Sequence, residues 1–257
     1  MLVSMTLARG QPGGDFGDED RAGVPLWQVD AENPEDVFTF VRVKYPSMRR
    51  GRWGRGGWST DYPASDFDLS YRLAQLTSLK VNPHPKILEL TDPALLDHPF
   101  IYLVEPGAMA LEDEDVLALR RYLDAGGFLM IDDFWGEAEW HNFHGEMKRV
   151  FPDREPVELD ISHPIFSAVF PLKQKPQVPS IHVWLSQRVT WERYDAHEPH
   201  YRAWFDRNGR MVAIACHNTD LGDGWEREGE DAEYFHKFAE AQSYPMGINI
   251  IFYAMTH

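Results

Sequence analysis

Two adjacent aspartates, Asp132 and Asp133, directly follow an apolar run and are the residues best suited to chemistry. At the end of a strand, paired carboxylates can hold a divalent cation or share a proton as an acid/base pair. They can also cap the helix that follows, because Asp is among the preferred helix caps. Capping or loop solvation is the more common role of such a pair, and we take Asp132 and Asp133 as the candidate catalytic residues.

A basic segment is the second candidate for chemistry. It carries six cationic residues and no acid between positions 42 and 55: Arg42, Lys44, Arg49, Arg50, Arg52 and Arg55. Guanidinium groups bind phosphate, carboxylate or anionic sugars in bidentate geometry, and the interleaved glycines permit the segment to fold over a pocket. We expect Arg42, Arg52 and Arg55 to bind a small anionic or saccharide ligand. The alternative is a solvated loop that balances the acidic surface.

Charge and cysteine usage exclude several classes of function. The chain has 41 Asp and Glu against 25 Lys and Arg, a net charge of -16, which repels nucleic acid and anionic membranes. Its one cysteine, Cys216, excludes an intrachain disulfide and any Cys-rich metal site. His217 follows Cys216 on a predicted strand, so the two side chains should point to opposite faces and form no dyad. We predict no nucleic-acid partner and identify no cofactor.

Two further patterns are less specific. Glu137, His141 and His144 have the spacing of one helix face and could hold a metal ion, but this spacing is not a diagnostic zinc pattern, and surface polarity explains it as well. We therefore predict no metal ligand there. Trp135 lies near a loop, where it could stack on a sugar, although most of the 9 tryptophans are expected in the core.

Alternating strand and helix patterns predict an open α/β sheet with mostly parallel strands. In the first half, the predicted strands are 38–43, 86–90, 100–104 and 127–131, and the predicted helices are about 66–80, 113–125 and 137–150. Ser65 and Asp68 have the spacing of a capping box for the first helix. In the C-terminal half, we predict strands 181–185, 201–205 and 211–215, the last two joined by an Asn208-Gly209 turn and therefore antiparallel, and a helix that begins at Pro245.

The predicted domain organisation is a tail followed by one domain. Residues 1–36 lack periodicity and should form a disordered or loosely attached tail, and residues 37–257 should form a single α/β domain. Met1–Gly10 is similar to the end of a signal peptide, which would place the protein in the periplasm or outside the cell; otherwise we expect a cytoplasmic protein. No apolar run approaches the roughly 20 residues that span a bilayer.

The sequence resembles a bacterial domain of unknown function, family 4159, from about Phe38 to Thr256. The residues that carry the resemblance include Phe40-Val41-Arg42, Trp58-Ser59-Thr60-Asp61-Tyr62-Pro63, Tyr71-Arg72-Leu73, Leu76-Thr77-Ser78, Gly126-Gly127-Phe128-Leu129, Asp132-Asp133, His163-Pro164-Ile165-Phe166, Asn218-Asp220-Leu221 and Gly247-Ile248-Asn249-Ile250. That family is similar to the class I glutamine amidotransferase-like superfamily, which includes the ThuA-like proteins. The resemblance implies a flavodoxin-like sheet and no known activity.

The amidotransferases of that superfamily use a Gly-rich turn as an oxyanion hole and a cysteine on a sharp turn after the next strand. Glu105-Pro106-Gly107 resembles the first feature. The cysteine would fall at positions 132–134, where this chain has no Cys, Ser or Thr. The resemblance therefore implies that amidotransferase chemistry is absent.

The carboxyl ends of parallel strands meet at one edge of a sheet, where ligands bind. We therefore expect Asp61 to lie within about 10 Å of Asp132 or Asp133, close to the basic segment, because one cation with waters or one arginine can bridge that span. Other expected ligand-binding residues at this edge are Glu105, Gly107, Asn218 and Asp220. We expect a ligand-binding domain; the alternatives are a hydrolase that uses Asp132 or Asp133, with or without a metal, and a subunit that binds another protein in an envelope assembly.

Overall fold

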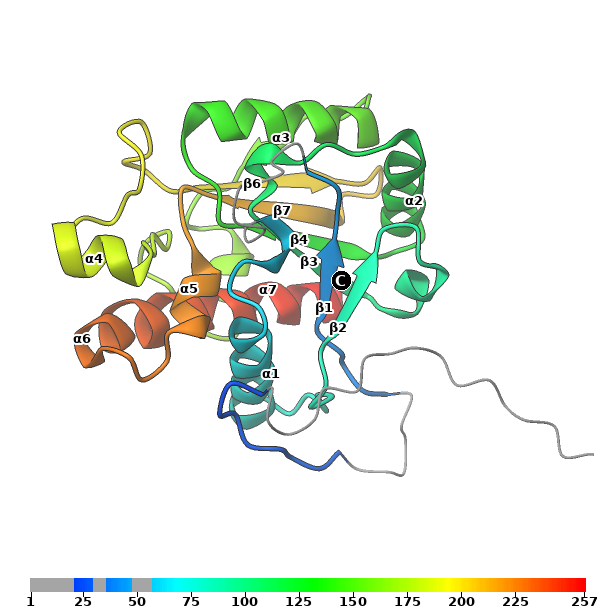
Figure 1. The fold of residues 1–257 in the computed structure, drawn as a ribbon. Coiled ribbons are helices and arrows are strands. Elements are labelled where there is room, and N and C mark those ends of the chain that lie inside the picture. Colours follow the sequence, from blue (N-terminus) through cyan, green and yellow to red (C-terminus); the bar gives the residue numbers. More distant parts are fainter. Residues whose placement is uncertain (1–20, 30–35, 48–56) are drawn as a thin grey trace, which may run out of the picture.

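The strands of the computed structural model form one seven-stranded sheet with the order β2-β1-β3-β4-β7-β6-β5 (Figure 1). The structure describes residues 21–29, 36–47 and 57–257. Five neighbouring strands are parallel: β2 (Lys86–Glu89), β1 (Val41–Lys44), β3 (Phe100–Val104), β4 (Phe128–Asp132) and β7 (Met211–His217). β6 (His200–Phe205) is antiparallel to β7 and to β5 (Val157–Glu158). The predicted parallel sheet with an antiparallel C-terminal extension is confirmed.

The central strands are buried on both faces, which explains their continuous apolar sequences. In β3, Phe100 and Tyr102 pack into one half of the core, whereas Ile101 and Leu103 pack into the other. This is the period-2 alternation of a strand. The sheet therefore needs a cover of helices on each face.

Helices provide that cover (Figure 1). On one face lie α2 (Asp113–Asp124) and α3 (Gly136–Val150), which bury Leu119 and Phe143 against the sheet. On the other face lie α1 (Ala64–Leu76), α5 (Leu221–Glu226) and α7 (Tyr244–Thr256). The predicted helices of the first half are confirmed, with α1 ending a turn earlier than expected.

The C-terminal helical run starts earlier than the sequence indicates. α6 (Ala232–Tyr234) leads into a π-helix, η6 (Phe235–Ser243), which continues into α7. The α-helical part therefore begins at Tyr244, one residue before Pro245, and the helical run begins earlier still. A residue without a backbone N–H is tolerated there because it lies in the first turn of α7.

Two local predictions are wrong. Residues 181–185 belong to a helix, α4 (Ile181–Gln187), because the Ser180 hydroxyl caps the Val183 N–H and Ile181 and Trp184 are buried on one side. The Ser65–Asp68 capping box does not form either. The residue before α1 is Pro63, which has no capping side chain, and Ser65 binds the guanidinium of Arg42 instead.

Part of the predicted tail packs against the domain. Arg21 is buried, and its guanidinium donates to the carbonyl groups of Val24, Pro25 and Pro83, while the Trp27 indole donates to Val81. Residues 1–20 and 30–35 of the predicted tail lie outside the described residues. Within the described part of the chain, no helix combines the length and apolar character needed to span a bilayer.

Candidate functional site

Three aspartates meet at the carboxyl edge of the parallel strands. Asp133 directly follows β4, Asp220 caps α5 shortly after β7, and Asp61 lies in the segment between β1 and α1. Each contributes one carboxylate oxygen to a group in which all three oxygens lie within 4.8 Å of one another. The expected approach of Asp61 to the Asp132-Asp133 pair is confirmed. We call Asp61, Asp133 and Asp220 the aspartate trio.

Arg42 fixes the segment that carries Asp61. Its buried guanidinium binds both carboxylate oxygens of Asp66, with Nε 3.0 Å from each, and donates to the carbonyl groups of Trp58 at 3.1 Å and Thr60 at 2.8 Å. Arg42 lies in β1, within the predicted strand 38–43, and is fully buried. Its observed contacts make it a positioning residue for Asp61.

Asp132 lies beside the trio and is fully buried. Its Oδ2 accepts hydrogen bonds from the Tyr102 hydroxyl at 3.1 Å and the Gly222 N–H at 3.0 Å, whereas its Oδ1 has no hydrogen-bond partner. Gly222 is required by space, since a Cβ atom there would lie 2.5 Å from Asp61 Oδ2. That Asp61 oxygen is also buried and without a partner.

Neither residue of the Asp132-Asp133 pair caps α3. The helix starts after Trp135, which provides no side-chain cap, and Asp133 Oδ1 accepts the Trp135 indole N–H at 3.0 Å. Asp220 Oδ1 accepts the Asp223 N–H at 2.7 Å. Neighbouring groups thus orient the carboxylates of Asp133 and Asp220, and these two residues are only 7% and 4% exposed.

The backbone is left-handed at four residues of this edge. Asp61, Glu105, Asp133 and Asn218 have φ values of 62°, 49°, 56° and 62°. Such conformations cost free energy in residues other than glycine and concentrate at functional sites. They turn the chain sharply at the ends of β3, β4 and β7.

Burial and mutual repulsion disfavour the ionised forms of these acids. Burial, together with Asp223 and Glu226, raises the pKa of Asp61 well above its usual value. Burial raises the pKa of Asp133 and Asp220 in the same way, and other acids of the cluster add to it. Without a cation, the cluster therefore retains protons at pH values where exposed aspartates have lost them.

A second group of acids shares Asp61 with the trio. One oxygen each of Asp61, Asp223 and Glu226 lies within 4.8 Å of the others. The two groups differ in their cationic partner: Arg227 pairs with the second group, with its Nε 3.4 Å from Asp223 and 2.8 Å from Glu226. No described lysine, arginine or histidine forms an ion pair with the aspartate trio.

The other predicted ligand-binding residues have structural contacts. The Glu105 carboxylate accepts the Gly57 N–H at 2.5 Å, and Gly107 packs against the Glu139 side chain. Asn218 accepts from the Gly136 N–H and donates to the Glu198 carbonyl. Trp135 is buried, as was expected of most of the tryptophans, so its ring is not open to stacking on a sugar. Arg52 and Arg55 lie outside the described residues.

Neither the histidines of α3 nor Cys216 belongs to the group of residues at the trio. His141 binds the carbonyl of Glu137 in its own helix, and His144 lies 3.0 Å from Glu155, so these side chains do not converge on a common ligand position. Cys216 and His217 pack into opposite halves of the structure, as strand alternation requires. Burial raises the pKa of the Cys216 thiol well above its usual value, which disfavours the nucleophilic thiolate.

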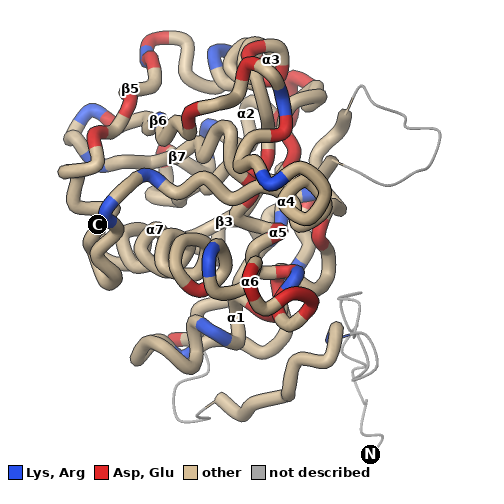
Figure 2. The backbone as a smooth tube through the Cα atoms, turned by 90° about the vertical axis from the view of Figure 1, so that its left-hand side faces the viewer, with Lys and Arg blue, Asp and Glu red and all other residues tan. Residues whose placement is uncertain are grey.

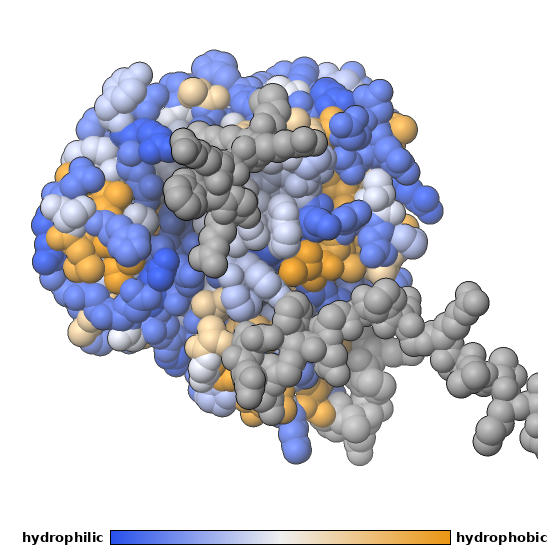
Figure 3. Space-filling model, viewed as in Figure 1, coloured by the Kyte–Doolittle hydropathy of each residue, from blue (hydrophilic) through white to orange (hydrophobic). Residues whose placement is uncertain are grey.

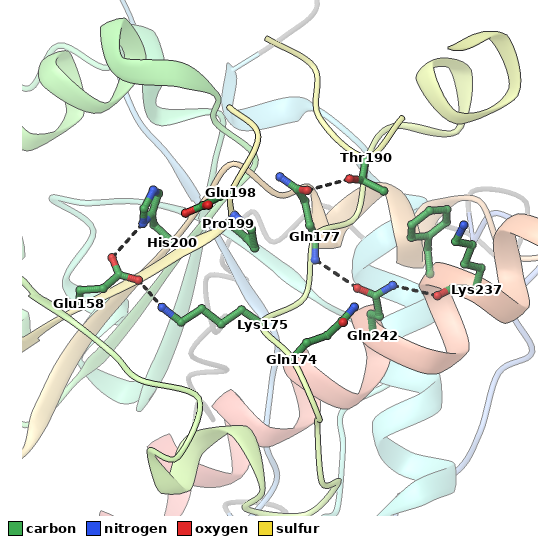
Figure 4. Close-up of a pocket in the computed structure, with 11 residues that line it drawn as sticks. Glu158, Gln174, Lys175, Gln177, Thr190, Glu198, Pro199, His200, Lys237 and Gln242 are labelled. Carbon is green, nitrogen blue, oxygen red and sulfur yellow. Dashed lines mark hydrogen bonds and ion pairs between the residues drawn. The ribbon is translucent and has the colours of Figure 1, made fainter. Parts of the chain in front are cut away.

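A cavity of about 630 Å³ lies away from the trio, between the β5–β6 edge and the π-helix (Figure 4). Lys175 and Lys237 balance Glu158 and Glu198 in its lining, and the remaining polar groups include three glutamines, Gln174, Gln177 and Gln242. Gln177 donates to the Asn218 carbonyl. The cavity wall therefore contacts the loop that leads to Asp220.

Acidic residues, red in Figure 2, also occur along the backbone around α5 and α6. The visible face in Figure 3 is mainly hydrophilic, and its apolar side chains lie in separate small areas.

Sequence reasoning missed Asp223, Glu226, Tyr102 and Gly222. The Asp220-Leu221-Gly222-Asp223 sequence, which has two acids three positions apart after a predicted strand, is the signal that could have identified Asp223.

Comparison with known proteins gives the family. No curated protein matches the chain. One family model matches residues 39–255, which include every described residue of the aspartate trio and its supports. Because this match covers most of the chain, the protein belongs to the family described as Domain of unknown function (DUF4159).

Proposed function

We propose that this protein is a divalent-cation-dependent ligand-binding domain. The aspartate trio would hold the cation, and an anionic ligand would complete its coordination. The observation that carries this proposal is the convergence of three carboxylate oxygens within 4.8 Å beside the buried, unpartnered oxygens Asp61 Oδ2 and Asp132 Oδ1. Carboxylate oxygens are the ligands that Mg²⁺, Ca²⁺ and Mn²⁺ prefer.

Charge balance favours a metal ion at this position. Buried carboxylates need a cation, a hydrogen-bond donor or a proton. The described structure provides donors to one oxygen each of Asp133 and Asp220 and no ion-pair partner to either. A divalent cation would remove the remaining repulsion, and its open coordination positions would select an oxyanion ligand.

The position of the trio at the carboxyl edge of the parallel strands supports this proposal. The parallel strands follow the order β2-β1-β3-β4-β7, which corresponds to the flavodoxin-like order, and ligands of that fold bind beyond the carboxyl ends of the strands. We infer a flavodoxin-like, glutamine amidotransferase-like domain on this basis. Glutamine hydrolysis is not expected, because β4 leads into Asp132 and Asp133 where a cysteine nucleophile would be needed. Wild-type protein and Cys216→Ser should release equally little ammonia from glutamine.

Binding of a divalent ion is the direct test. We expect Mn²⁺ or Ca²⁺ to bind the wild type in about 0.15 M salt, where weak surface attraction is screened. Asp133→Asn and Asp220→Asn should lose at least tenfold in affinity by titration calorimetry. Glu114→Gln, which removes an exposed acid from α2, is the matched control and should bind as the wild type does. Equal affinity in all four proteins would refute the proposal.

A hydrolase is the second candidate, and the free oxygen of Asp132 favours it. Asp132 Oδ1 is buried without a partner next to the trio, so it could accept a proton from a metal-held water. Turnover of nitrophenyl esters and phosphoesters would distinguish the two functions. In a hydrolase, Asp132→Asn should abolish turnover and retain the bound ion. Absence of turnover in ion-loaded wild type would favour the binding domain.

A further inference from the structure

Arg227 lies against the second acidic group, which shares Asp61 with the aspartate trio. Its Nε is 2.8 Å from Glu226 Oε2 and 3.4 Å from Asp223 Oδ1, and its Nη1 is 3.0 Å from Glu230. The oxygens of this group lie within 4.8 Å of one another, the same limit as in the trio. The two groups therefore offer similar ligand sets that share one carboxylate, that of Asp61.

From this arrangement we propose that the Arg227 guanidinium takes the place of a second divalent cation and supplies the positive charge that this cation would otherwise supply. The native protein then binds one divalent ion, at the aspartate trio, and loss of Arg227 opens a second ion site formed by Asp61, Asp223 and Glu226. This inference rests on the proposed function, because it assumes that the trio holds an ion.

Unsatisfied oxygens point to a ligand beyond the acidic cluster itself. Asp61 Oδ2 is buried and accepts no hydrogen bond, and Glu226 Oε2 is buried with the Arg227 guanidinium, 2.8 Å away, as its charge partner. Asp223 differs, because its Oδ2 accepts from the Ile181 N–H at 2.7 Å and the Tyr234 hydroxyl at 3.0 Å. Asp223 is thus held in place, Asp61 presents a free oxygen to a cation, and loss of Arg227 would free Glu226 Oε2 as well.

The guanidinium can be removed without removing any carboxylate ligand. The Arg227 side chain is 27% exposed, so a neutral replacement would leave space that reaches solvent. Loss of its charge leaves Asp61, Asp223 and Glu226 without a cation in contact, apart from any ion at the trio. A second divalent ion would restore that balance through the carboxylate ligands that such ions prefer.

Counting bound Mn²⁺ tests the inference. In equilibrium dialysis read by electron paramagnetic resonance, the wild type should bind one ion per chain, and Arg227→Met should bind two. Arg227→Met combined with Asp133→Asn should return to one ion, at the second site. Arg188→Met is the matched control, since it removes an exposed arginine that pairs with Glu233 at 2.8 Å, and it should bind one ion.

The outcomes separate the two proposals. A wild type that binds no ion would refute the proposed function. A wild type and an Arg227→Met protein that each bind one ion would overturn only the inference about Arg227. Circular dichroism checks folding, and Arg227→Gln, which keeps a polar side chain able to reach Glu230, repeats the count if the methionine variant does not fold.

Discussion

Asp133→Asn should stabilise the protein when divalent ions are absent and leave it less stable than the wild type when they are present. The substitution keeps the shape of the side chain, and its amide oxygen can still accept the Trp135 indole N–H. It removes one charge from a group of oxygens that lie within 4.8 Å. Only a residue retained to bind a cation should show both effects.

The magnitude without ions follows from the repulsion within the trio. Two full charges 4.8 Å apart repel by about 3.5 kcal/mol at an effective dielectric of about 20. Proton uptake relieves part of this, so we expect Asp133→Asn to increase the free energy of unfolding by about 1–3 kcal/mol in chelator. The folded protein raises the pKa of Asp133, so it keeps a proton that the unfolded chain releases above about pH 4. The wild-type penalty therefore grows as pH rises, and the gain from the variant should be larger at pH 8 than at pH 5.

The magnitude with ions follows from mass action. An ion at about 100 times its dissociation constant stabilises the folded state by about 2.7 kcal/mol, which corresponds to an increase of about 5–11 °C in Tm for a domain of this size. Asp133→Asn should gain little of this. Urea and thermal unfolding in EDTA and in MnCl₂ provide the four values. A variant less stable than the wild type in both solutions would show that Asp133 stabilises the fold, and would refute the reasoning.

The remaining predictions concern the groups around the site. Gly222→Ala should displace the Asp61 carboxylate, lower stability by about 1–3 kcal/mol and abolish the ion-induced rise in Tm, whereas Gly145→Ala, with open space at its Cβ, should do neither. Arg42→Met leaves a buried carboxylate unpaired and should cost about 3–5 kcal/mol in urea unfolding; a cost below about 1 kcal/mol would contradict the assigned role. Burial raises the pKa of Asp68 to about 8, so wild-type stability should decrease as pH rises from about 4 to about 8. Asp68→Asn should reduce this slope, and identical pH profiles would contradict the prediction.

Much of the fold was predictable because the central strands are buried on both faces. The runs at 100–104 and 127–131 have no polar interruption, and helices on both sides are the usual solution. The Asn208-Gly209 turn was equally direct, since this dipeptide suits a tight hairpin. Residues 181–185 were wrongly predicted as a strand because their β-branched and aromatic side chains favour one. Only the Ser180 cap and tertiary burial select the helix.

The site was predictable where it depends on topology. Because the strands are parallel, the residues that follow β1 and those that follow β4 emerge at the same edge of the sheet, which brings Asp61 close to Asp133. The role of Arg42 was not predictable, because an arginine next to a basic segment has the same sequence pattern whether it is exposed or buried. Its pairing with Asp66 spans 24 residues and exists only in the folded chain.

The aspartate trio combines two unfavourable features that a purely structural cluster would avoid. Its carboxylates are buried close together, and the backbone at Asp61 and Asp133 is left-handed, where asparagine or glycine would reduce the charge or the strain. This arrangement also depends on three particular neighbours, Arg42, Tyr102 and Gly222, which hold it in place. Protein stability favours neutral, relaxed residues at such positions, and their opposite character here is what the proposed cation site would require, since a cation needs negative oxygens at a fixed separation. The same argument applies to the contrast between the two acidic groups: Arg227 pairs with one of them, and the other, without such a partner among the described residues, is the one that we propose to bind a cation from solution.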